Sequence, residues 1–151
     1  MSASSGEPGV ARTDGREELR ERVRSDEVAP DDARVVLRGG PDTLSLLRSH
    51  ARRVNRLFVL DGDEVWAISV LVALDEVGAR SADSLLRSKL RSYDVVYRST
   101  VSQLLTAGFS LLPTFTRPHY SVVLPELSAT PALLEALGAL VENPYALPQG
   151  G

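Results

Sequence analysis

Residues 57–72, LFVLDGDEVWAISVLV, decide the fold class of this chain. Two apolar runs that are rich in β-branched residues, 57–60 and 64–72, flank the turn sequence Asp61-Gly62-Asp63, in which glycine supplies a positive φ. This pattern predicts two strands joined as a β-hairpin. The longest apolar stretch, residues 65–74, is about half of the ~20 residues that a membrane span requires, so we expect no membrane span.

Further elements follow on both sides of the hairpin. Residues 35–38 predict a strand closed by Gly39-Gly40-Pro41, and Asp42 is expected to cap a helix whose buried stripe is Leu44, Leu47, Ala51 and Val54. More strands are expected over 93–97, 109–115 and 119–124, and helices are expected after the capping residues Ser81, Thr100 and Thr130, the last helix ending at Asn143-Pro144. Helices and strands interleave without strict alternation, which predicts an α+β fold: one domain with helices packed on a mixed β-sheet.

The two ends of the chain differ from this central part. Residues 1–14 are too polar to offset their ordering entropy, and residues 15–25 carry only Leu19 and Val23 as an apolar pair, so they form a frayed helix or a docking segment. We predict a disordered or partly helical acidic tail over 1–32, a globular α+β domain over 33–143 and a flexible tail over 144–151.

Composition excludes several function classes. The 151 residues contain no cysteine, which rules out disulfides, thiolate metal sites and a cysteine nucleophile, and the two histidines predict no metal centre. The first residues lack the pattern of a signal peptide, so we expect a soluble cytoplasmic protein. The net charge of −3 divides into −4 over residues 1–32, +3 over 33–128 and −2 over 129–151. A mildly basic core between acidic flanks suits an anionic partner such as RNA, or simply a solvated surface.

The segment 116–120, TRPHY, combines a fixed cation, an imidazole and a phenol at the start of a predicted strand. Cleavage of RNA needs a group that moves the 2′-hydroxyl proton and cations that stabilise charge on the phosphate. We therefore predict Arg117, His119 and Tyr120 as catalytic residues, although Tyr120 is expected on the other face of the strand. The alternative is that Pro118 only shapes a turn beside a half-buried histidine.

A row of arginines, Arg48, Arg52 and Arg56, follows at intervals of four on the exposed side of the first predicted helix, with Arg53 beside it. Phosphate contacts from such a row give sequence-independent affinity for RNA, so we predict these residues as an RNA-binding face. An ordinary solvated helix face is the alternative.

The third candidate set is Arg38 at the end of the first strand, Ser69 within WAISV, and Glu126 after the last predicted strand. This arrangement resembles ADP-ribosyltransferases, in which an early arginine and a later serine hold NAD and a glutamate on a further strand completes the set. The resemblance implies NAD as a cofactor or substrate, whereas the RNA hypothesis requires no cofactor. The dinucleotide-binding spacing GxGxxG is absent.

A broader likeness rests on VVLRGG, LDGDEVWAISV and AGFSLLPTFTRPHYSVVLP. These pieces resemble small uncharacterised actinobacterial proteins of toxin–antitoxin-like gene pairs, which implies a small effector with an antitoxin-like protein partner. Three functions are thus open: a toxin-like effector acting on RNA, an ADP-ribosyltransferase-like effector, and a non-catalytic module that binds a partner through its C-terminal helix or N-terminal segment.

Overall fold

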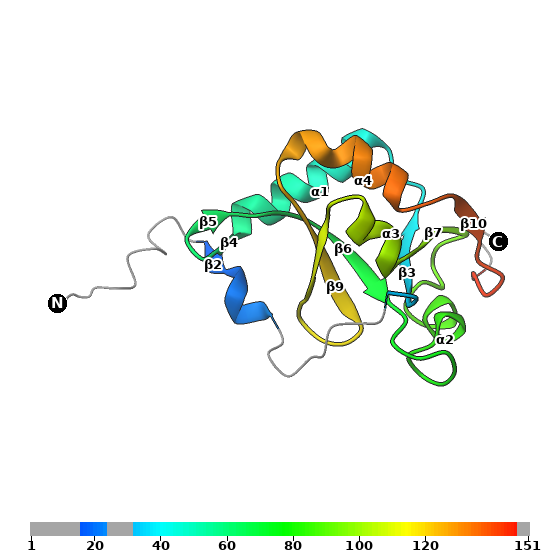
Figure 1. Cartoon of the computed structure of the whole chain (residues 1–151). Coiled ribbons are helices and arrows are strands. Elements are labelled where there is room, and N and C mark those ends of the chain that lie inside the picture. Colours follow the sequence, from blue (N-terminus) through cyan, green and yellow to red (C-terminus); the bar gives the residue numbers. More distant parts are fainter. Residues whose placement is uncertain (1–15, 24–31, 148–151) are drawn as a thin grey trace.

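An antiparallel six-stranded sheet forms the centre of the structure, a computed structural model that describes residues 16–23 and 32–147 (Figure 1). The strand order is β10-β7-β3-β6-β9-β8. The strands are β3 (Val35–Gly40), β6 (Trp66–Val72), β7 (Val95–Thr100), β8 (Ser110–Pro113), β9 (His119–Leu124) and β10 (Leu140–Glu142). A small mixed sheet is built from β2 (Glu17–Glu18), β4 (Phe58–Leu60) and β5 (Asp63–Glu64). Helices on mixed and antiparallel sheets in one compact domain confirm the predicted α+β class.

Helices cover both faces of the large sheet. Among the described residues these are α1 (Leu44–Leu57), α2 (Ala82–Arg87), α3 (Val101–Thr106) and α4 (Thr130–Ala136). Figure 1 shows α1 and α4 side by side, with α2 at the opposite end of the molecule. Successive residues of a strand point to opposite faces, so Val36 packs in the main core under α1, α3 and α4, while Leu37 packs against α2.

The predicted hairpin turn and two predicted caps are confirmed, but the predicted strand 64–72 is divided between β5 of the small sheet and β6 of the large one. Asp61 and Gly62 have φ angles of +53° and +85°, as a tight turn between β4 and β5 requires. The hydroxyl of Ser81 accepts the Ser84 amide hydrogen at the start of α2, and Thr100 does the same for α3. The helix α1, by contrast, is capped by Thr43 and not by Asp42. The Asp42 carboxylate binds Arg38 instead.

The N-terminal segment 16–23 lies against the domain. It forms β2 and a 3-10 helix, η2 (Leu19–Arg22), and Leu19 is only 1% exposed in a cluster with Val65 and Ala67. No α-helix forms here, so the structure corresponds to the docking segment and not to the frayed helix. Our predictions for residues 1–15 and 24–31 lie outside the described residues.

The C-terminal helix is shorter than predicted. It ends at Ala136, and residues 140–142 form β10, which pairs with β7. The reason is Gly138, whose φ of +86° breaks the helix and whose missing side chain lets the backbone approach the Arg98 carbonyl oxygen. Thr130 is the first residue of α4 and not its cap.

The last described residues, 144–147, lie on α2 and were expected in a flexible tail. The Asn143 side chain binds the Leu86 and Leu90 carbonyl oxygens, and the Arg87 guanidinium lies 4.5 Å from the centre of the Tyr145 ring. The predicted flexible tail also includes residues 148–151, which lie outside the described part of the chain. Within that part, no helix is long and apolar enough to cross a membrane.

Candidate functional site

The large sheet splits between β3 and β6, and the candidate site lies at this split. The two strands pair only at Val36–Val72 and Leu37–Leu71, whereas β6 and β9 pair over six positions. Beyond the split, no residue of β3 pairs with Ser69, and two side chains bind its backbone on that side instead. Its carbonyl oxygen accepts from Arg38 Nη1 at 2.7 Å, and its amide donates to Nε2 of His50 on α1 at 3.3 Å. Buried backbone groups need such partners.

The Arg38 side chain is held in place by hydrogen bonds to Asp42 and to the Ser69 backbone. Its Nε and Nη2 donate to the two carboxylate oxygens of Asp42 at 2.8 and 3.4 Å, and the two side chains are only 14% and 10% exposed. The Asp42 amide in turn donates to the hydroxyl of buried Tyr97 at 2.9 Å. A two-point contact fixes the guanidinium plane, and Asp42 neutralises its charge. Arg38 therefore joins the end of β3 to Asp42 and to Ser69 of β6 at one end of the site.

His50 is neutral at pH 7. Burial, reinforced by the positive charges of Arg38 and Arg53, lowers its pKa from 6.5 to about 4, while Asp42 acts in the opposite direction. The contacts of its ring agree with this result, because Nε2 faces the Ser69 amide and Nδ1 lies 3.2 Å from Nη2 of Arg53. A neutral ring can accept at one of these two nitrogens, whereas a protonated ring would present an N–H group to both donors. His50 thus serves as a hydrogen-bond acceptor and is too weakly basic for proton transfer at neutral pH.

His119 faces the site from the first position of β9. Its Nδ1 lies 2.8 Å from the Thr114 hydroxyl, which lies 2.9 Å from the hydroxyl of buried Ser121. The ring of Phe115 packs edge-on against the imidazole with 5.0 Å between ring centres. These contacts on Nδ1 and on the ring fix the orientation of the imidazole.

A pocket of about 350 Å³ opens between these groups. Its lining residues are Leu37, Arg38, Gly39, Pro41, Asp42, Ser69, Val70, Leu71, Lys89, Leu90, Tyr93 and His119. The ring of Tyr93 lies over Gly39, where an added Cβ would come within 2.6 Å of three ring atoms, and yet Tyr93 is 41% exposed. The pocket therefore combines an accessible aromatic ring, an exposed lysine and an imidazole, a suitable set for a nucleotide-sized anion.

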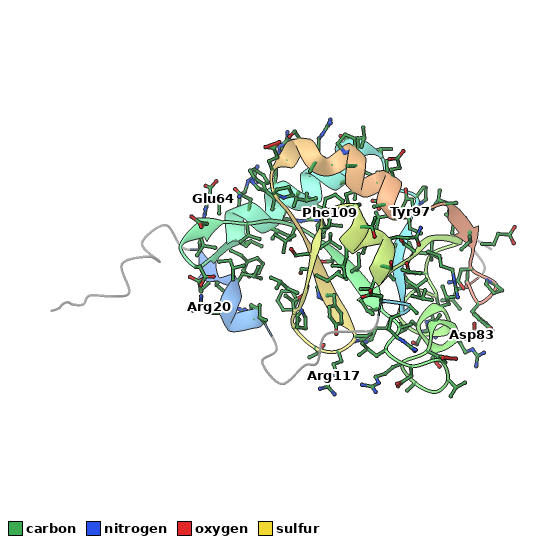
Figure 2. The ribbon with its side chains drawn as sticks, viewed as in Figure 1. Arg20, Glu64, Asp83, Tyr97, Phe109 and Arg117 are labelled. Carbon is green, nitrogen blue, oxygen red and sulfur yellow. The ribbon has the colours of Figure 1, made fainter. Side chains whose placement is uncertain are left out.

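Of the three predicted catalytic residues, the structure brings only His119 into this pocket. Tyr120 is fully buried in the main core, on the opposite face of the strand as expected. Arg117 is exposed at the lower edge of the molecule in Figure 2 and is not among the residues that line the pocket.

The predicted arginine row lies elsewhere on α1. Arg52 and Arg56 are exposed and Arg48 is half-buried. At about 100° per residue, Arg52 points about 160° away from His50 around the helix, whereas Arg53 points about 60° away. The arginine of this helix that borders the site is therefore Arg53, which contacts His50.

Two of the three residues that resemble an NAD site come together. Arg38 contacts the Ser69 backbone, and both line the pocket. Glu126 is exposed, is bonded by the Ser128 hydroxyl and does not line the pocket. Ser121 is the partner of Ser69 in the sheet, and β9 continues from it for three residues, ~10 Å at the usual rise, before the chain leaves the strand and reaches Glu126.

Sequence reasoning missed His50, Asp42, Lys89 and Tyr93 as site residues. One local signal existed: Asp42 follows Arg38 by four residues across the Gly39-Gly40-Pro41 turn, a spacing that suits an ion pair. His50 contacts Ser69 from α1, and Lys89 and Tyr93 reach the pocket from the segment after α2. No sequence pattern connects these three residues.

Comparisons with known proteins give no relative: the sequence matches no protein-family model and no curated protein, and the fold matches no solved structure. Within residues 16–23 and 32–147, no group of three or more histidine, aspartate or glutamate side chains is placed to hold a metal ion.

Proposed function

We propose that this protein is a small toxin-like effector that binds RNA in the pocket at the split of the sheet and cleaves it, with His119 as the catalytic residue. The observation that carries the proposal is the position of His119, whose ring is oriented by Thr114 and lines a pocket together with Lys89 and Tyr93. Such a pocket has the size of a single nucleotide, so one nucleotide of a strand would enter it.

The chemistry follows from these groups. His119 accepts the proton of the 2′-hydroxyl as the bond between O2′ and phosphorus forms. The bond between phosphorus and O5′ then breaks, and the leaving oxygen takes a proton from water, which leaves a cyclic phosphate and a free 5′-hydroxyl. Lys89 supplies positive charge for the phosphate, because it is exposed in the pocket wall, while the charge of Arg38 is already offset by Asp42. A base stacks on Tyr93.

The proposal includes an antitoxin-like protein partner and action in the cytoplasm. An RNA-cleaving effector with an open pocket needs restraint in the cell that makes it. A partner that covers the pocket mouth, where Lys89 and Tyr93 are exposed, would block entry of RNA without changing the fold.

A second candidate function is supported by the contact between Arg38 and Ser69 in the same pocket. In the ADP-ribosyltransferase-like reading these residues hold NAD. The position of Glu126 outside the pocket disfavours this reading, because Asp42 is then the only carboxylate among the lining residues and it is bound to Arg38. Calorimetric titration with millimolar NAD tests it, and saturable binding that Arg38→Ala removes would support it.

The decisive experiment measures cleavage of single-stranded RNA by the full chain. We expect His119→Gln to lower the rate by about 10²–10⁴-fold with an unchanged thermal melt. Lys89→Gln should weaken RNA binding, and the slope of log affinity against log salt concentration should fall by about 1, the amount expected for one lost phosphate contact. Arg80→Gln is the matched control, because Arg80 is ion-paired with Asp75 and lies outside the pocket. A folded His119→Gln variant with full activity, or wild-type protein that cleaves no RNA, overturns the proposal.

A further inference from the structure

Residues 114–116 of the loop between β8 and β9 contact both the backbone and the ring of His119, which also pairs with Leu71 of β6 in the sheet. The Thr114 amide donates to the His119 carbonyl oxygen at 3.2 Å, and the His119 amide donates to the Thr116 carbonyl oxygen at 2.9 Å. The Thr114 hydroxyl and the Phe115 ring contact the imidazole itself. The orientation of the ring therefore depends on the conformation of residues 114–116.

This loop contains a strained residue. Phe115 has a φ of +56°, which is rare for a bulky side chain and costs about 1–3 kcal/mol, so it persists only where surrounding contacts enforce it. Two contacts come from the N-terminal segment. The Phe115 amide donates to the Arg22 carbonyl oxygen at 2.9 Å, and Val23 forms an antiparallel bridge with Thr114. A third comes from Phe58, whose ring centre lies 6.1 Å from that of Phe115.

The N-terminal segment has its own anchor on the domain. Leu19 is 1% exposed and packs with Val65 and Ala67, while β2 pairs in parallel with β4. The Glu18 carboxylate accepts the Asp61 amide hydrogen at 3.0 Å. Segment 17–23 is thus fixed at one end by buried apolar surface and touches the His119 loop with the other.

We infer that residues 17–23 form a clasp that positions His119, with Leu19 as its anchor and Phe115 as the positioning residue that contacts the imidazole. When the anchor is loosened, Phe115 relaxes to a negative φ, and its ring and the Thr114 hydroxyl leave the imidazole. The positioning stands on these contacts alone, and its effect on cleavage rests on the proposed function.

The test compares two leucine truncations in the full chain. Leu19→Ala removes the anchor, and Leu133→Ala is the matched control, because it truncates an equally buried leucine on α4, on the other face of the sheet. The readout is the NMR signal of the His119 ring, which carries a ring-current shift from Phe115. The chain has only two histidines, so His50→Gln assigns the two signals.

We expect Leu19→Ala to move the His119 ring signal toward its value in an unfolded peptide and to bring the chemical shifts of its two ring nitrogens closer together. Leu133→Ala should lower the melting temperature by a similar amount but leave the His119 ring signal and its nitrogen shifts unchanged. If cleavage is observed, Leu19→Ala should lower kcat by about 10-fold or more with KM within about 2-fold. Should Leu19→Ala fail to fold, Leu19→Val gives the smaller shift in the same direction. An unchanged signal in the folded anchor variant, or an equal change in both truncations, overturns the clasp. Absence of cleavage in the wild type overturns only the proposed function.

Discussion

The stability of the protein should fall between pH 6.5 and pH 4 because of His50. Burial and the nearby guanidinium groups lower its pKa to about 4 in the folded state, whereas the unfolded chain protonates near 6.5. Between these values the unfolded state binds more protons than the folded state, so protons favour unfolding. The contribution is fully present above pH 6.5 and is lost as the pH falls toward 4.

The size of the effect follows from the two pKa values. The interval from 6.5 to about 4 corresponds to at most ~3.4 kcal/mol, at ~1.36 kcal/mol for each pH unit. His50 is half-buried, so solvent screening reduces this figure, and we expect the free energy of unfolding to fall by about 2 kcal/mol between pH 7.5 and pH 4.5 on its account.

The assay is urea unfolding of the wild type and of His50→Gln at several pH values. Glutamine has no proton to gain, and its side-chain oxygen can accept from the Ser69 amide as Nε2 does now. The difference between the two curves isolates His50 from the carboxylates, which titrate in both proteins. His119→Gln, which removes the other histidine, is the control. The same pH dependence in wild type and His50→Gln would refute the assignment.

Two stability predictions concern backbone strain and buried charge. Gly138→Ala should cost about 2 kcal/mol or more in a thermal melt, since it combines a φ of +86° with a carbonyl oxygen 2.6 Å from the new Cβ. Gly62→Ala, at a φ of +85° with nothing within 4 Å, should cost only about 1 kcal/mol, and equal losses would contradict the clash. Arg38→Gln should cost about 3 kcal/mol in urea unfolding because it leaves a carboxylate that is 10% exposed without its cation. Arg80→Gln breaks a similar pair that is 42% exposed and should cost less than about 1 kcal/mol, so a large loss there would count against the role of burial.

Most elements of the fold were predictable because their signals are local. The turn at Asp61-Gly62, the caps at Ser81 and Thr100, and the strand from His119 to Leu124 each depend on residues that lie close together in the chain. The end of the last helix was wrong because the apolar spacing continues past a glycine that ends the helix and packs against the Arg98 carbonyl oxygen. The apolar spacing of α4 continues through Leu140 and Val141, but these residues pair with β7 after Gly138 ends the helix.

The candidate site was predictable only in fragments. His119, Arg38 and Ser69 were chosen from the sequence, but for two different functions, and the structure places all three around one pocket. Arg117, Tyr120 and Glu126 were chosen by the same reasoning and do not line it. Tyr120 lies on the opposite face of β9, as the alternation of strand residues predicts, and Glu126 lies beyond the end of β9, away from Ser69.

The sequence by itself determined the turn at Asp61-Gly62, the caps of α2 and α3, and the apolar runs that form β3, β6 and β9, because turn and cap chemistry act within three or four residues. Only the tertiary structure decided that β3 and β6 separate beyond Leu37. That separation brings Arg38 to Ser69 across 31 positions and His50 to Ser69 across 19. The physical reason is that the point at which strand pairing stops depends on the packing of the whole sheet, and the unpaired backbone groups then take whichever distant side chains the fold places beside them.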